Sequence, residues 1–132
     1  MTTISAAKKK AWKACSRYIR QKHADSNGYA SCVTCGATKR WQDLDAGHFV
    51  PKSRGNRAYF EIGEGPWSVM PYSNVWPQCK GCNGPRGGEL IRYAAFIRER
   101  YGDGVDVEMV EKLRSATYRT QDYEMIREYC EA

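Results

Sequence analysis

Four of the six cysteines form two short pairs of the kind that holds a metal ion. The pairs read Cys-Val-Thr-Cys and Cys-Lys-Gly-Cys. A Cys-x-x-Cys turn places two thiolates on one side of a tight loop, and two such turns supply the four ligands of a closed structural zinc site. A single turn of this kind could be a redox motif, whereas a matched pair favours zinc. We therefore predict a structural Zn²⁺ ion bound by Cys32, Cys35, Cys79 and Cys82.

A second group of polar residues lies between these pairs and directly after them. Asp45-Ala-Gly-His48 and Asn74 stand between the pairs, and Asn83 follows the last cysteine. A neutral imidazole can take a proton from water at pH 7. Carboxylate and amide oxygens suit Mg²⁺ or Mn²⁺, which would stabilise the transition state at a phosphate and the leaving oxygen. These residue types predict a phosphodiester hydrolase that uses one hard cation.

Two short strands and a helix must bring these residues together. The patterns predict strands over 44–50 and 74–78 and a helix over 88–101. Residues 51–73 are rich in Gly, Pro, Ser and Arg, and we expect a long loop there with a little strand near 59–62. The bound zinc would hold both strands against the helix.

Further helices are predicted on both sides of this core. Residues 5–24 carry apolar side chains at three- and four-residue spacing among many lysines and arginines, which indicates a basic amphipathic helix. That helix could contact phosphates, or its charges could form a solvated outer face. Residues 105–131 mix acidic and basic side chains and predict a helical extension. We expect one α+β domain over 1–132, with its core at 29–101.

The charge of the chain is unevenly distributed. The formal net charge is +6. Residues 1–60 hold twelve basic and three acidic side chains, whereas residues 61–132 hold nine and twelve. The basic half indicates a polyanionic partner such as nucleic acid, the alternative being a solvated surface. No apolar run approaches the roughly 18 residues of a membrane span. No apolar segment of a signal peptide follows the first lysines. We expect a cytoplasmic protein without a membrane partner, in which Cys15 and Cys130 are ordinary buried thiols.

The order of these motifs resembles that of the HNH, or ββα-metal, nucleases, in particular the zinc-bearing branch that includes phage endonuclease VII. Residues 9–20, 45–50 and 74–83 also resemble the NinG/Rap recombination proteins of lambdoid phages. The resemblance implies a treble-clef-like zinc core. It also implies a structure-specific endonuclease that cuts Holliday junctions, D-loops and similar branched DNA inside the bacterial host. Four-way junctions have two-fold character, so paired cuts favour a homodimer, with 105–131 as the expected interface.

The resemblance also assigns roles to single residues. His48 matches the general base that activates the attacking water, Asn83 a ligand of the catalytic metal, and Asn74 the residue that braces the loop and orients the histidine. Many HNH proteins carry a metal-binding Asp directly before the histidine, where this chain has Gly47. Residues three apart on a strand point to opposite faces, so Asp45 reaches the metal only if the strand bends. Asp45 is therefore the expected second ligand, or else a partner of a nearby Lys or Arg; the reserve candidates are Asp43, Glu61 and Glu89.

Basic and aromatic residues near these motifs complete the expected DNA surface. Trp67, Tyr72 and Trp76 could stack on unpaired bases or pack in the core, and His23 is expected at the surface or facing phosphates. Phosphate contacts are predicted for Lys9, Lys10, Lys13, Arg17, Arg20, Lys52, Arg54, Arg57 and Arg86.

Two other functions fit the same residues. A non-catalytic zinc-ribbon module that binds DNA, such as a recombination mediator, needs the cysteines and the basic helix but no convergent His and Asn. A less selective HNH nuclease would cut linear duplex as well as branched DNA.

Overall fold

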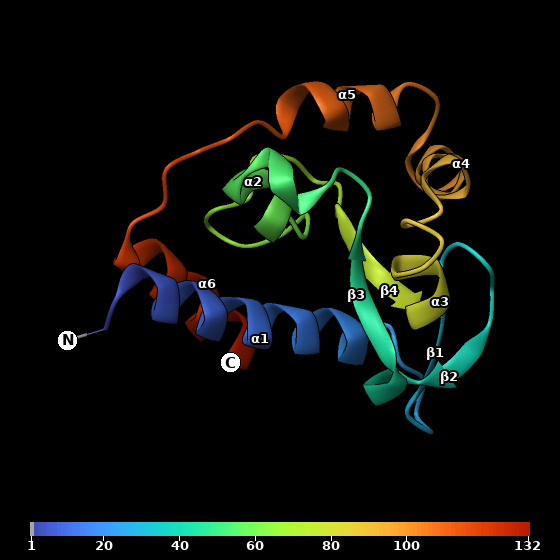
Figure 1. Ribbon diagram of the computed structural model, residues 1–132, viewed down its shortest axis with the longest axis horizontal. Coiled ribbons are helices and arrows are strands. Elements are labelled where there is room, and N and C mark those ends of the chain that lie inside the picture. The colour runs from blue at the N-terminus through green and yellow to red at the C-terminus, as the bar shows by residue number, and fades with distance from the viewer. Residues whose placement is uncertain (1) are drawn as a thin grey trace.

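The computed structural model describes residues 2–132 and has a mixed α+β fold. Helix α1 (Ile4–Lys22) runs along one edge of the molecule, and α6 (Thr120–Glu131) packs against it, so that both chain ends lie on the same side (Figure 1). Strands β3 (Leu44–His48) and β4 (Val75–Cys79) form an antiparallel pair next to α1. The predicted α+β class is confirmed, and both strands lie within one or two residues of their expected positions.

A second antiparallel pair of strands holds the first Cys-x-x-Cys pair. Strands β1 (Tyr29–Ser31) and β2 (Thr38–Arg40) form a hairpin that the sequence patterns did not locate. Cys32 and Cys35 lie in its turn. Strand β4 ends at Cys79, and the short helix α3 (Lys80–Asn83) follows at once. The hairpin and the β4–α3 corner therefore bring the two cysteine pairs together.

The prediction of a little strand near 59–62 is wrong. Residues 52–60 instead form a 3₁₀ turn, Lys52–Arg54, and the helix α2 (Asn56–Phe60). Ile62 alone pairs with Ser73, in an isolated bridge. Gly55, which precedes α2, has a φ of 124° that favours glycine, and a Cβ there would lie 2.6 Å from the Cα of Ser115. The turn that starts α2 thus depends on a close approach to a distant segment.

Small residues form the buried face of α1. Ala7, Ala11 and Ala14 are buried, as are Cys15 and Ile19, and they pack in one core cluster with residues of α6. The alanines let the two helices approach closely. The larger apolar side chains of the same helix, Trp12 and Tyr18, are only partly buried.

The C-terminal helices bury their apolar faces within the chain. Helix α5 (Val105–Lys112) packs on α4 (Leu90–Tyr101), where Met109 and Ile97 are fully buried. In α6, Ile126 is fully buried against the cluster that includes α1. The buried apolar residues of 105–131 are therefore explained by packing inside one chain, whereas Val107 and Val110 of α5 are exposed.

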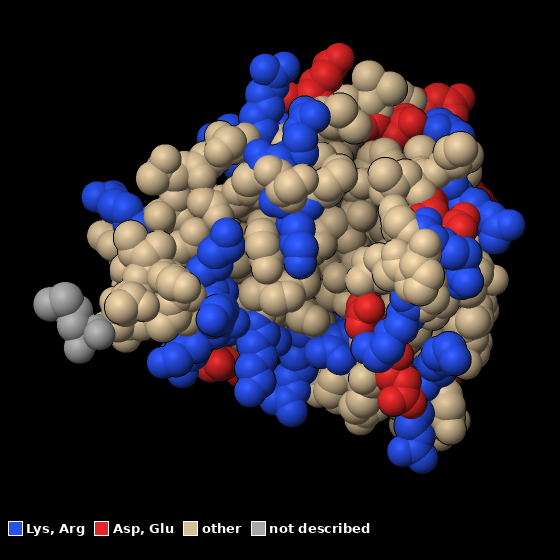
Figure 2. All heavy atoms as spheres, in the orientation of Figure 1, with Lys and Arg blue, Asp and Glu red and all other residues tan. Residues whose placement is uncertain are grey.

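Lysine and arginine side chains gather along the edge formed by α1, whereas basic and acidic side chains are mixed around the opposite end of the molecule (Figure 2). Within residues 2–132, no helix is long and apolar enough to cross a membrane.

Candidate functional site

The four paired cysteines converge on one point. Their Sγ atoms all lie within 4.8 Å of one another, and the Sγ atoms of Cys35 and Cys79 are 3.7 Å apart. Two Zn–S bonds of about 2.3 Å at a tetrahedral angle place the sulfurs about 3.8 Å apart, so the geometry fits zinc. These side chains, Cys32, Cys35, Cys79 and Cys82, could hold one Zn²⁺ ion as predicted.

Arg86 lies against this cysteine cluster. Its Nη2 donates to the Sγ of Cys82 at 3.3 Å and lies 3.8 Å from the Sγ of Cys79. Four thiolates around one Zn²⁺ carry a net charge of −2, which a guanidinium offsets. The structure therefore places Arg86 beside the zinc ligands, a contact that the predicted phosphate role did not include.

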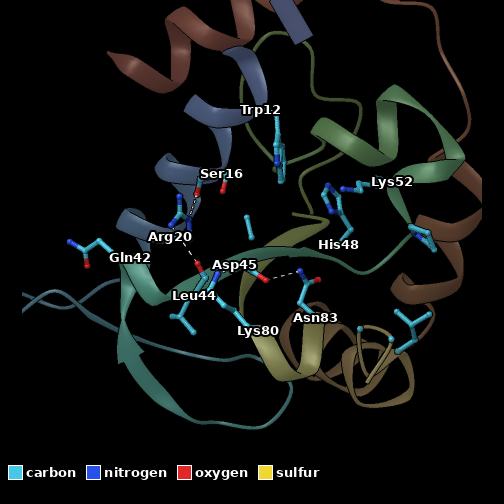
Figure 3. Close-up of a pocket in the computed structure, with 15 residues that line it drawn as sticks. Trp12, Ser16, Arg20, Gln42, Leu44, Asp45, His48, Lys52, Lys80 and Asn83 are labelled. Atoms are coloured by element: carbon cyan, nitrogen blue, oxygen red, sulfur yellow. Dashed lines mark hydrogen bonds and ion pairs between the residues drawn. The ribbon is translucent and has the colours of Figure 1, made fainter. Parts of the chain in front are cut away.

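Three of the other predicted site residues, Asp45, His48 and Asn83, line a cleft of about 470 Å³ between α1, β3 and α3. Its lining comes from segments far apart in the sequence, and the polar side chains point into a common space (Figure 3). We call this space the cleft; its lining includes Trp12, Arg20, Asp45, His48, Lys52 and Asn83.

His48 is held as a neutral base at the end of β3. Its Nε2 lies 2.9 Å from the backbone oxygen of Tyr59, and because a carbonyl only accepts, Nε2 carries the hydrogen and Nδ1 keeps its lone pair. The indole of Trp12 stacks on the imidazole with ring centroids 4.9 Å apart. Burial lowers the pKa of His48 to about 4, with a smaller lowering from Lys52. The imidazole is therefore unprotonated at pH 7.

Asn74 is fully buried and fixes the loop around His48. Its Oδ1 accepts from the backbone N–H of Val50 at 2.8 Å, and its Nδ2 donates to the carbonyls of Val50 at 3.0 Å and Ala58 at 2.8 Å. Val50 lies two residues after His48. Ala58 directly precedes Tyr59, whose backbone oxygen accepts the hydrogen bond from His48. One amide thus ties β4 to both segments that orient the imidazole.

Asp45 and Asn83 lie side by side in the cleft. The Nδ2 of Asn83 donates to Oδ2 of Asp45 at 3.0 Å, and Lys80 forms an ion pair with Oδ1 at 2.6 Å. Burial raises the pKa of Asp45, but the contacts with Lys80 and Asn83 lower it more, so the carboxylate is ionised. Of the two roles expected for Asp45, the structure shows the pairing with a lysine, and it places the carboxylate in the cleft that His48 and Asn83 also line.

The reserve carboxylates lie elsewhere. Glu61 is buried and accepts from the hydroxyl of Ser68 and, at 2.7 Å, from the backbone N–H of Val69, so it organises its own loop. Glu89 pairs with Arg86 and Arg92, and Asp43 is exposed.

The side chain of Gln78 occupies the space beside Gly47. A Cβ on Gly47 would lie 2.0 Å from the Oε1 of Gln78, so a carboxylate at position 47 would displace that side chain. The Nε2 of Gln78 donates to the Gly88 carbonyl at 2.7 Å and to the hydroxyl of Thr34 at 3.1 Å. Because position 47 has no room for a carboxylate, Asp45 is the carboxylate that β3 supplies to the cleft.

The predicted phosphate contacts divide into groups. Arg20 and Lys52 line the cleft, Lys9 and Lys13 extend along α1, and Lys10 and Arg17 line a different surface together with α6. Arg54 donates to the carbonyl of Val110 at 3.2 Å, and Arg57 is exposed on α2.

Of the two roles left open for Trp67, Tyr72 and Trp76, the structure shows packing, because Trp67 and Trp76 are buried and Tyr72 packs on Tyr101. His23 is half-buried and stacks on Trp76 with ring centroids 4.5 Å apart.

Sequence reasoning missed the parts that Trp12, Tyr59 and Lys80 play in the cleft. Each acts through a contact with a residue at least eleven positions away, which local spacing does not reveal.

Comparison with known families gives one match. Over residues 3–132, the chain matches the family described as bacteriophage lambda NinG protein. No curated protein and no solved structure matches it.

Proposed function

We propose, from the premise that this chain belongs to the NinG family of bacteriophage proteins, that it is a metal-dependent endonuclease for branched DNA. One observation carries the proposal: a neutral His48, fixed through Nε2 by the Tyr59 carbonyl, shares a cleft with Asp45 and Asn83. A module that only binds DNA has no need for this arrangement. The order β3, β4, α3, with the histidine on β3 and the asparagine on α3, supports the ββα-metal interpretation.

In this proposal His48 is the general base, and its Nδ1 accepts the proton of the attacking water. Asp45 and Asn83 would hold Mg²⁺ or Mn²⁺, which when bound stabilises negative charge on the phosphate and the leaving oxygen. Arg20 and Lys52 line the same cleft and would bind phosphate oxygens. We place the activity in the cytoplasm of the infected bacterium and assign the paired cuts at a junction to a homodimer.

The test is cleavage of a synthetic four-way junction with Mg²⁺ or Mn²⁺. His48→Gln should lower the cleavage rate about 100-fold or more, because it removes the general base. The chain offers a matched control, since His23→Gln changes the other histidine and leaves the cleft intact. If the wild-type protein shifts the junction in a gel but never nicks it, the non-catalytic DNA-binding module is the correct function. Equal cutting of linear duplex would instead identify a less selective nuclease.

The metal assignment has a separate test in the absence of DNA. Asp45→Asn should weaken Mn²⁺ binding about tenfold or more, because it removes the anionic ligand. Lys80→Met should strengthen binding, because the ammonium paired with Asp45 competes with the cation. Electron paramagnetic resonance of free Mn²⁺ measures both. Unchanged affinity in both variants would remove Asp45 from the metal site.

A further inference from the structure

A second groove, of about 540 Å³, lies beside the cleft and along α1. The two are continuous, because Trp12, Ser16 and Arg20 line both. We call it the α1 groove; its lining includes Lys8, Lys9, Trp12, Lys13, Arg20 and Tyr59.

The lysines of the α1 groove have no acidic partner. Among the described residues, Lys8, Lys9 and Lys13 form no ion pair within 4.0 Å. Several basic residues of the C-terminal helices have acidic partners instead; for example, Arg98 pairs with Asp106 at 2.9 Å and Arg127 with Glu131 at 3.1 Å. The positive charge along the α1 groove is therefore uncompensated, and an anionic ligand would lower the repulsion between these lysines.

Two of the free ammonium groups from different elements meet at one aromatic ring. The Nζ of Lys8, on α1, lies 4.8 Å from the ring centroid of Tyr59, and the Nζ of Lys52 lies 5.5 Å from it. The backbone carbonyl of Tyr59 accepts from His48. The same residue thus joins the charged groove to the imidazole of the cleft.

We propose that the α1 groove binds the sugar–phosphate backbone of the DNA strand that continues out of the cleft from the scissile phosphate. Its phosphates contact Lys8 and Lys9, and its sugars lie against Trp12 and Tyr59. This inference rests on the proposed function only in that DNA occupies the cleft. It separates Lys8 and Lys9 from Lys10 and Arg17, which line only the surface shared with α6, whereas Lys13 lines both surfaces.

The test compares two double variants of the same helix. Binding of a fluorescein-labelled four-way junction is measured by anisotropy with no added Mg²⁺ or Mn²⁺. The variant K8Q/K9Q should bind about tenfold more weakly at 0.1 M salt, and its slope of log Kd against log salt should fall by about 1 to 2, because phosphate contacts are lost. The matched control K10Q/R17Q removes the same charge and should stay within twofold of wild type. Equal losses in both variants, or no loss in K8Q/K9Q, would overturn the proposal.

A second measurement uses the wild-type chain. Acetylation of lysines, followed by mass spectrometry with and without the junction, should show protection of Lys8 and Lys9 but not of Lys10. Equal protection of all three would reject the α1 groove as the path. Since neither measurement involves cleavage, a protein that passes both and never cuts DNA would refute the endonuclease and leave the DNA path in place.

Discussion

Asn74 is the residue on which the geometry of the cleft most depends. It makes three hydrogen bonds from a fully buried amide, and all three reach the segments that flank His48. The backbone of Asn74 also donates to Glu61 and accepts from Phe49. A single side chain therefore fixes the position of the imidazole without touching it.

Asn74→Ala should lower the free energy of unfolding by about 3 kcal/mol, because it leaves buried backbone groups of Val50 and Ala58 without partners. Urea denaturation measures the change. The control is Asn27→Ala, which alters an exposed asparagine. Equal stability of both variants would show that Asn74 does not brace the loop.

Residue types and spacing were enough to bring Asp45, His48, Asn74 and Asn83 into one hypothesis. The structure places His48, Asp45 and Asn83 in the cleft and Asn74 directly behind it. The pairing of Asp45 with a lysine or arginine was one of the expected roles, but the identity of Lys80, 35 positions away, could not be predicted, because an exposed lysine carries no local sign of its partner. The contact of Arg86 with Cys82 was not predicted for the same reason, since it depends on the conformation of the turn between them.

At the scale of elements, the sequence predicted the helices and strands that have a regular apolar pattern. Tertiary contacts determine the remaining elements. The strands and the helices were found because their apolar residues recur at the period of each structure. Helix α2 was missed because it has only five residues, begins at a glycine with positive φ and is held by Asn74 from β4. The buried face of α1 was misjudged because its alanines bury less area than Trp12 or Tyr18 but allow closer packing.

His23 makes the attachment of α1 sensitive to pH. It ends the helix and stacks on Trp76. Burial, together with smaller contributions from the charges of Lys22 and Arg100, lowers its pKa to about 4. In the unfolded chain the imidazole binds a proton below about pH 6.5, whereas in the folded chain it stays neutral down to about 4. The unfolding free energy should therefore fall as the pH drops through this window.

His23→Gln should flatten this dependence. Urea denaturation of wild type and variant between pH 7.5 and pH 5.5 should show a smaller loss of stability in the variant. Some slope should remain, because the pKa of His48 is lowered in the same direction. Identical slopes in the two proteins would mean that folding does not perturb His23.

For the molecule as a whole, the cysteine cluster joins parts that share little other packing. Its buried neighbours are few: Ala30, Leu44 and the cysteines themselves form the third core cluster. A zinc ion bound there would contribute folding energy directly, because the unfolded chain has no preformed site.

We expect about one zinc ion per chain by elemental analysis. Cys32→Ser should abolish binding and raise the sensitivity of the β1–β2 hairpin to protease. Cys15→Ser is the matched control, since it changes a buried cysteine outside the cluster and should retain the zinc. A protein that folds with disulfides and without metal would contradict the assignment.

The packing of α1 on α6 also determines when the fold around the cleft can be completed during synthesis. Helix α1 carries Trp12, which covers His48, and α6 holds α1 in place. Glu64 reinforces this by accepting from Tyr18 of α1 and Tyr129 of α6. A nascent chain that has not yet released residues 120–131 from the ribosome lacks the part of the α1 docking surface that α6 supplies. The support of α1, and with it the cover that Trp12 gives His48, is therefore complete only after this segment has left the ribosome.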